Sequence, residues 1–249
     1  MLNLLENGII QSIKQIKEDI KVSFSAAIPI CLGYLPLGFA CGVLAQKIGL
    51  SIFEIAGMSL IVFAGSSQFI AVSMIGTNSS IEVIIMATFV VNLRHFLLSS
   101  VLAKYLRNKK KSFLLIYSHG VTDESFAINY NKFTEGIWNS QKAIIVNIIS
   151  FSCWNFGNII GGLAGAILPV SNEIASYTLT AMFICLLVLN LKNKAFIIVG
   201  IITGAASIYL SLILKNSFYI VITAILGASV GYFIENKMLK KKRDKNNVE

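Results

Sequence analysis

Charged residues are scarce in this sequence. They make up 13% of it, whereas about a quarter of the residues in a typical soluble domain are charged. Hydrophobic residues make up 55%, and the mean hydropathy is +0.74. A chain of 249 residues cannot bury so much apolar surface in a water-soluble core, so lipid must be the solvent for most of it. The composition therefore excludes an ordinary soluble domain.

Histidine and cysteine are also scarce, with 2 and 4 residues. Cys31, Cys41, Cys153 and Cys185 lie within apolar segments, without a CxxC pair or a His/Cys metal spacing, so we interpret them as packing residues. Motifs typical of metalloproteases, serine hydrolases, phosphate-binding loops and dinucleotide sites are missing as well. We therefore expect no metal, no cofactor and no enzymatic activity.

Long stretches without any charged residue make up most of the sequence. About 20 such residues cross the hydrocarbon as a helix, which pairs all its backbone groups internally. The sequence therefore predicts an all-α integral membrane protein with about seven membrane segments, some of them broken. They are Val22–Gln46, Ile55–Ile81, Val83–Ala103, Ala143–Ser171, Ile174–Leu191, Ala195–Leu214 and Asn216–Ile234.

Three regions follow from this pattern: an amphipathic segment at 1–21, a transmembrane transport domain at 22–235 and a basic tail at 236–249. The net charge of +9 is concentrated between apolar segments and at the ends, where it orients a membrane protein, so we do not expect nucleic-acid binding. Both the tail and the basic run Lys104–Lys111 are expected to be cytoplasmic.

The stretch Ser112–Gln141 is too polar for an ordinary span. If it does not cross, counting back from a cytoplasmic tail places the basic N-terminus on the outer side, which conflicts with its charge. The conflict disappears if Val22–Gln46 is a re-entrant hairpin, broken near Pro29, Gly33 and Pro36. Both a span and a hairpin remain open for this segment.

A faint internal similarity relates Gly38–Ala45 to Gly157–Ala164, since both fit G-x3-G-x-L-A. By the same charge count the two motifs run in opposite directions, as in the inverted repeats of many transporters. The alternative is that G-x3-G is only a close-packing pattern of membrane helices.

Arg94 is the most informative single residue, because a guanidinium half-way along a span needs an acid, an aqueous cavity or a path to the interface. It can clamp a substrate carboxylate together with Asn92, or form an ion-pair gate. Pairing with a structural acid or with headgroups is the alternative. His95 is a candidate for proton coupling, although a histidine beside an arginine more often only bonds to a neighbour.

Other polar side chains within apolar stretches complete the candidate site. Ser66, Ser67 and Gln68 follow Gly65, where an unwound helix would offer backbone groups to a substrate. Asp123 and Glu124 can neutralise Arg94 or bind a substrate ammonium, but they can also be ordinary loop acids. We expect Asn155 and Asn158, next to Trp154, to line the opposite side, unless they only bond between helices.

Pro36–Ala45, Ala64–Phe69, Asn92–His95 and Thr122–Glu124 together resemble the AzlC family, also called the YgaZ type. The resemblance implies the large subunit of a bacterial exporter of branched-chain amino acids in the cytoplasmic membrane. It also implies a small membrane partner of the AzlD/YgaH type.

We therefore expect a secondary exporter of valine, leucine, isoleucine or close analogues that works by alternating access. Two alternatives remain. One is a membrane assembly subunit whose partner carries the site. The other is an intramembrane hydrolase that uses Ser66 or Ser67 with His95 or His119.

Overall fold

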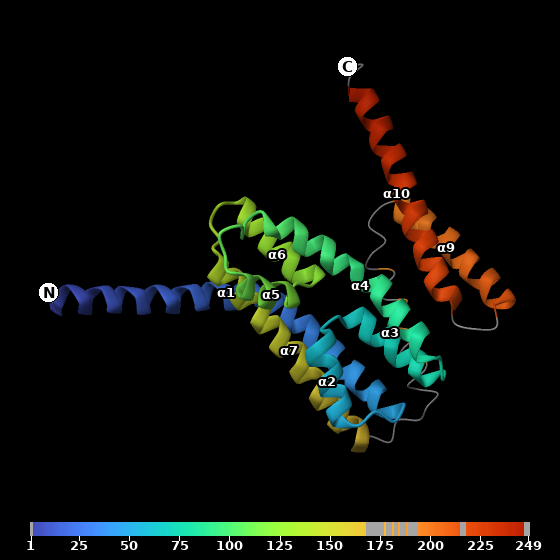
Figure 1. Ribbon diagram of the computed structural model, residues 1–249, viewed down its shortest axis with the longest axis horizontal. Coiled ribbons are helices and arrows are strands. Elements are labelled where there is room, and N and C mark those ends of the chain that lie inside the picture. The colour runs from blue at the N-terminus through green and yellow to red at the C-terminus, as the bar shows by residue number, and fades with distance from the viewer. Residues whose placement is uncertain are drawn as a thin grey trace. The chain divides into compact units, whose positions relative to one another are not determined.

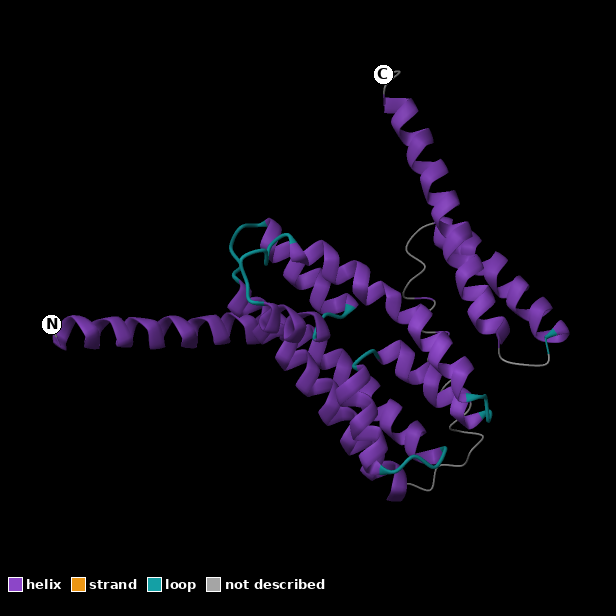
Figure 2. Cartoon of the chain, in the orientation of Figure 1, coloured by secondary structure: helices purple, strands orange, loops and turns teal. Residues whose placement is uncertain are grey.

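The computed structural model describes residues 2–167, 194–214 and 218–246, together with the single positions 177, 181, 184 and 188. Every regular element in this part of the chain is a helix, so the all-α prediction is confirmed there (Figure 2). The helices are α1 (Leu2–Lys47), α2 (Ile52–Val62), α3 (Gly65–Gly76), α4 (Ile81–Ala103), α5 (Lys111–His119), α6 (Asp123–Thr134), α7 (Ser140–Ile167), α9 (Lys194–Ile213) and α10 (Phe218–Asn246).

The chain forms two compact units. The first comprises Met1–Gln68 and Asn92–Pro169, and the second comprises Phe69–Val91 and Val170–Glu249. The boundary between them falls within α3 and within α4. All candidate site residues belong to the first unit.

Among the described residues, four helices are long and apolar enough to cross a membrane: Ile13–Lys47, Ile81–Ala103, Ser140–Ile167 and Phe196–Ile213. They correspond to four of the predicted segments. The predicted segment Ile174–Leu191, with Cys185, lies outside the described residues. Ile222–Ile234 of α10 is apolar but shorter. The total of seven segments thus stays a prediction.

Of the two alternatives for Val22–Gln46, the re-entrant hairpin is wrong. α1 remains helical over 46 residues, with Pro29 and Pro36 inside it. Each proline removes one helical hydrogen bond but does not force a reversal, because its neighbours keep helical backbone angles. Close packing of α1 along α7 supports the helix through this region (Figure 1).

α1 and α7 run in the same direction. At one end the Asn139 amide donates to Asp19 Oδ2 at 3.3 Å. At the other end, a Cβ added to Gly165 would lie 3.1 Å from Val43 Cα. The opposite directions expected for the two G-x3-G motifs are therefore wrong. That expectation rested on the charge count, which treated every apolar segment before the tail as a full crossing.

The glycine motifs instead form the contact between these two helices. A Cβ on Gly42 would overlap the carbonyl oxygen of Asn158, and a Cβ on Gly161 would overlap that of Phe39. Only glycine allows the two backbones to approach so closely. The close-packing interpretation of G-x3-G is confirmed for this pair.

Two pairs of helices are each interrupted by a short tip that lies in the first unit. α2 ends at Phe63, which has left-handed backbone angles (φ 38°), and α3 begins at Gly65 after Ala64. The second tip, Gly120–Thr122, separates α5 from α6. α2 has 11 residues and α6 has 12, so each is about 16–18 Å long and too short to cross alone.

The α5–α6 pair is a hairpin that leaves and returns to the C-terminal end of α4. Phe113 of α5, Phe133 of α6 and Leu106 after α4 share one apolar cluster. The tip lies beside the middle of α4, where His95 Nδ1 is 2.7 Å from the carbonyl oxygen of Val121. Ser112–Gln141 is therefore not a single span, as its polarity predicted.

In the second unit α9 and α10 pack in opposite directions. A Cβ on Gly227 would lie 2.8 Å from Thr203, and one on Gly231 would lie 3.8 Å from Val199. A separate small cluster contains Met74, Val83 and Ala87, with Ile220 packed against it.

Candidate functional site

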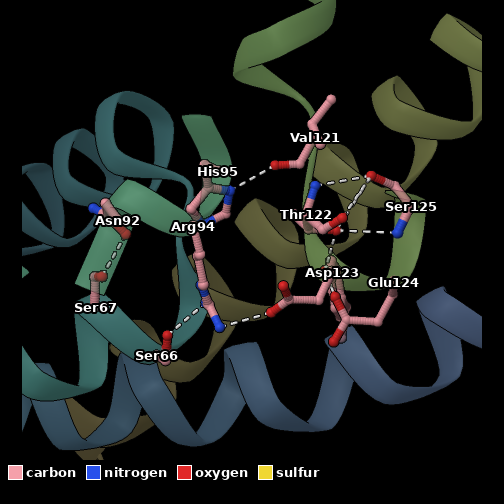
Figure 3. A network of polar contacts seen from close by, with 11 residues as sticks. Ser66, Ser67, Asn92, Arg94, His95, Val121, Thr122, Asp123, Glu124 and Ser125 are labelled. Carbon is pink, nitrogen blue, oxygen red and sulfur yellow. Dashed lines mark hydrogen bonds and ion pairs between the residues drawn. The ribbon is translucent and has the colours of Figure 1, made fainter. Parts of the chain in front are cut away.

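Arg94 lies near the middle of α4 and connects the two helix tips (Figure 3). Its Nη1 is 2.7 Å from Asp123 Oδ2, and its Nη2 donates to Ser66 Oγ at 2.6 Å. Asp123 is the first residue of α6, and Ser66 is in the first turn of α3. The predicted pairing of Arg94 with Asp123 is therefore present, with a serine as the second partner.

The α3 end of this arrangement exposes backbone donors. The left-handed turn at Phe63 starts a new helix at Gly65, and the first backbone N–H with a helical partner is that of Gln68, which donates to Ala64 O at 2.9 Å. The preceding amides in the first turn have no such partner within the helix. The N-terminal end of α3 is thus electropositive close to Arg94.

The interruption lies slightly earlier than predicted. The sequence suggested an unwound stretch around Gly65, but Gly65 begins α3, Ser66–Gln68 belong to its first turn and the break is at Phe63–Ala64. The physical reason is that Phe63 is buried against the Phe151 ring, with ring centroids 4.8 Å apart, which holds the turn at that position.

At the N-terminal end of α6 the side chains carry negative charge instead. Thr122 caps α6 and forms a reciprocal capping box with Ser125, and Asp123 and Glu124 follow in the first turn. Carboxylates at this position are stabilised by the helix dipole. The two acids therefore place negative charge beside the positive end of α3.

Tyr34 of α1 is a site residue that the sequence analysis missed. Its hydroxyl donates to Glu124 Oε2 at 2.5 Å and lies 2.7 Å from Thr122 Oγ1. Its ring packs edge-on against Trp154, with centroids 5.4 Å apart. A tyrosine within an apolar segment is too common to signal such a contact.

The other residues of the predicted serine cluster have partners of their own. Ser67 Oγ donates to Asn92 Oδ1 at 2.5 Å, which joins α3 to α4. The Trp154 indole N–H donates to Gln68 Oε1 at 2.7 Å, which joins α3 to α7. Gln68 is fully buried, yet its amide nitrogen has no hydrogen-bond partner.

Both histidines hold the tips through backbone carbonyls. His95 Nδ1 donates to Val121 O, which leaves its buried Nε2 without a hydrogen-bond partner (Figure 3). His119 Nε2 lies 3.0 Å from Leu60 O and so joins the end of α5 to α2. His95 therefore acts in this structure as a neighbour-bonding residue, the alternative that the sequence left open.

Asn155 and Asn158 are not brought into the Arg94 network. Each donates one turn back along α7, Asn155 to Phe151 O at 2.8 Å and Asn158 to Trp154 O at 3.0 Å. Their Oδ1 atoms are buried without a hydrogen-bond partner. Asn158 instead faces the glycines of α1.

The hydrolase alternative finds no support in this geometry. Ser66 bonds to Arg94 and Ser67 to Asn92, while His95 and His119 bond to backbone carbonyls. Within the described ranges, no group of three or more His, Cys, Asp or Glu residues could hold a metal ion.

The Arg94–Asp123 pair remains accessible. The Arg94 side chain is 37% exposed and that of Asp123 is 48% exposed. Neither charge is therefore enclosed by the protein, and a solute can reach the pair.

Comparisons with known proteins agree with the resemblance described above. The family model described as AzlC protein matches residues 29–168. The branched-chain amino acid transport protein AzlC of Bacillus subtilis is 32% identical over 177 residues, which cover 70% of this chain and 68% of that protein.

Two further relatives are membrane proteins. An uncharacterized membrane protein of Archaeoglobus fulgidus is 35% identical over 169 residues, 67% of this chain and 73% of that protein. The inner membrane protein YgaZ of Escherichia coli is 29% identical over 175 residues, 68% of this chain and 71% of that protein. No solved structure matches the chain significantly.

Proposed function

The chain belongs to the AzlC family, and from this premise we propose that it is the large subunit of a secondary transporter that exports branched-chain amino acids. Its substrates are valine, leucine, isoleucine or close analogues. The name of the Bacillus subtilis relative supports the substrate class. The expectation that the chain is a transporter rather than an enzyme rests on the same family.

The observation that carries this proposal is the ion pair between Arg94 and Asp123. It lies where the tip of α2–α3, the tip of α5–α6 and the middle of α4 meet. Interrupted helices that meet around a charged residue are the usual construction of a binding site in secondary transporters. A purely structural helix bundle has no need for such costly polar groups at this depth.

The mechanism that we propose is alternating access with the ion pair as a gate. With Arg94 bonded to Asp123 and Ser66, the two tips are held together. Binding of a substrate carboxylate to Arg94 would release Asp123 and let the α5–α6 tip move relative to α4. An apolar pocket distinguishes one methylene by only about 1–3 kcal/mol, so several aliphatic substrates are expected.

The proposed location is the cytoplasmic membrane, with the basic regions on the inner side. Asp19 of α1, the apolar cluster around Leu106 and the start of α7 lie at one end of the first unit. The N-terminal lysines and the run Lys104–Lys111 therefore share a side without any hairpin in α1, as the positive-inside rule requires. We propose that the tail of α10 is cytoplasmic as well.

The proposed partner is a small membrane subunit of the AzlD/YgaH type, which the family resemblance implies. The main alternative function is that this chain is a membrane assembly subunit and that its partner carries the site. The placement of charged residues between two helix tips of this chain favours a site here.

The test measures intracellular leucine and valine in cells fed with dipeptides. A strain that lacks both this protein and its small partner should accumulate these amino acids, and expression of both proteins should reverse the accumulation. Unchanged accumulation in the double deletion would contradict export.

Arg94→Ala then tests the site, with the exposed Arg107→Ala as the matched control. We expect export by Arg94→Ala to fall at least about tenfold, because a removed charge-assisted contact is worth roughly 1.5–3 kcal/mol. Arg107→Ala should export normally. Full export by Arg94→Ala would favour the assembly-subunit alternative.

A further inference from the structure

We propose that the Arg94–Asp123 ion pair is the empty form of a site for a zwitterionic α-amino acid. In this site both charges of the substrate are recognised and each replaces one partner of the pair. The inference rests on the proposed transport function and goes beyond it, because it assigns the ammonium group as well as the carboxylate.

The positive pole is built from two sources. The Arg94 guanidinium donates to Ser66 Oγ in the first turn of α3, where backbone N–H groups without helical partners add partial positive charge. A cation beside a positive helix end is unfavourable unless an anion lies between them. The Gln68 amide nitrogen, fully buried in the same turn and without a partner, is a further unused donor.

The negative pole lies directly beside it. Asp123 and Glu124 occupy the first turn of α6, and Asp123 Oδ2 is the atom that meets Arg94 Nη1 (Figure 3). Glu124 is held by the Tyr34 hydroxyl at 2.5 Å, which fixes one of its oxygens. Within the described part of the chain, the Asp123 carboxylate pairs with Arg94 and has no such hydroxyl anchor, so it is the more suitable carboxylate to exchange partners.

The two poles match the two charges of an α-amino acid. The Arg94 guanidinium and the positive N-terminal ends of α3 and α6 face the carboxylates of Asp123 and Glu124, so positive and negative charge nearly balance. A carboxylate bound at Arg94 frees Asp123, and an ammonium group then restores a partner to it. Once both groups are bound, neither Arg94 nor Asp123 is left unpaired, which avoids the cost of an isolated charge in an apolar surrounding.

A ligand with only one of the two charges breaks this balance. The carboxylate of the 2-keto analogue of leucine would bind Arg94 and leave Asp123 without a cation. The ammonium group of the decarboxylated analogue, 3-methylbutylamine, would bind Asp123 and leave Arg94 without an anion. Both should therefore bind far more weakly than leucine, although each has the same aliphatic side chain.

The experiment uses the full-length chain with its small partner in liposomes and measures counterflow of labelled leucine. We expect unlabelled leucine to compete, whereas the keto acid and the amine should not compete at a 100-fold higher concentration. Thermal stabilisation of the purified complex by each compound provides a second measurement. Competition by the keto acid as strong as that by leucine would overturn the inference and leave the transport function standing.

Asp123→Asn tests the negative pole alone, because it removes the charge of Asp123 and leaves Arg94 unchanged. This variant should lose at least tenfold in leucine counterflow, and its discrimination between leucine and the keto acid should fall by a similar factor. Glu135→Gln is the matched control, since Glu135 only pairs with Lys132 on an exposed face of the first unit. If Asp123→Asn does not fold, Asp123→Glu, which keeps the charge, should restore discrimination. Unchanged discrimination in Asp123→Asn would overturn the inference, and absence of leucine counterflow in the unmodified protein would overturn the transport function as well.

Discussion

Arg94 and Tyr34 organise the site from opposite sides. Arg94 reaches from α4 to the first turns of α3 and α6, while Tyr34 reaches from α1 to the first turn of α6. The two acids of α6 thus have different partners: Asp123 pairs with Arg94, and Glu124 accepts a hydrogen bond from Tyr34. The Asp123 carboxylate can therefore change partners while Glu124 keeps the N-terminal end of α6 attached to α1.

Tyr34→Phe tests the anchoring role of Tyr34. The substitution keeps the ring contact with Trp154 and removes only the hydroxyl, which donates to Glu124 and also contacts Thr122 Oγ1. We expect a loss of about 1–3 kcal/mol in the free energy of unfolding, because a carboxylate loses a charge-assisted hydrogen bond. Thermal unfolding of the purified protein in detergent measures this.

The matched control for Tyr34→Phe is Tyr130→Phe. Tyr130 lies in α6 and stacks on Phe126, with ring centroids 5.4 Å apart. The melting temperature of the Tyr130→Phe variant should remain close to that of the unmodified protein. Equal melting temperatures for both variants would show that the Tyr34 hydroxyl does not anchor Glu124.

The sequence could predict the site residues that stand out chemically, but not those that only assist. Arg94, Asp123 and Ser66 were identifiable because charges and clustered hydroxyls are rare in apolar segments. Tyr34 and the Trp154–Gln68 bond were not, since their partners are 90 and 86 residues away in the chain. Asn155 and Asn158 look equally polar in sequence, yet bond within α7.

At the scale of elements, the contact between α1 and α7 is fixed by glycine. Gly42 and Gly161 bring backbone against backbone, so neither helix can slide or separate without losing many short contacts at once. We therefore expect α1 and α7 to move as one body during transport. In the proposed mechanism the movement then takes place between α4 and this body, to which Tyr34 attaches the tip of α5–α6.

Gly42→Ala tests this contact. The added methyl group would overlap the Asn158 carbonyl oxygen, so the helices must separate, and we expect a loss of about 1–3 kcal/mol in unfolding free energy. The control is Gly33→Ala on the same helix, where a Cβ meets nothing within 4 Å. It should be neutral or slightly stabilising, since alanine favours helix. A Gly42→Ala protein as stable as the control would contradict the close packing.

Helix existence was predictable from hydropathy, whereas the exact positions of helix breaks were not. Pro29 and Pro36 suggested a reversal in α1 that does not occur, since a proline costs a helix one hydrogen bond but does not dictate a turn. The break that does occur, at Phe63, has no helix-breaking residue at that position. It is set by tertiary contacts of the Phe63 ring with Phe151 and His119, which no local pattern reveals.

At the scale of the whole molecule, the structure predicts on which side of the membrane the loops of the first unit lie. The hairpin α5–α6 begins and ends near the same apolar cluster, so Asn108 before it and Glu135 after it should lie on one side. Ser51, after the full length of α1, should lie on the other side. The basic N-terminus and the basic run Lys104–Lys111 then lie on the same side of the membrane, as their charge requires.

Single cysteines at these three positions, in a chain whose own cysteines are replaced, test this topology with a membrane-impermeant maleimide. We expect the Ser51→Cys variant to be labelled in intact cells. Asn108→Cys and Glu135→Cys should be labelled only after permeabilisation. Labelling of Asn108→Cys and Glu135→Cys from opposite sides would show that Ser112–Gln141 crosses the membrane.

The hairpin α5–α6 has a consequence for how the protein is made. Its polar tip depends on residues supplied by other helices: Tyr34 bonds at Glu124, and Asn147 of α7 donates to the Tyr117 carbonyl at 3.1 Å. During synthesis α5 and α6 leave the ribosome before α7 does. We therefore expect the hairpin to reach its final position only after α7 is inserted, because Asn147 packs against Gly120 of the tip and bonds to the Tyr117 carbonyl.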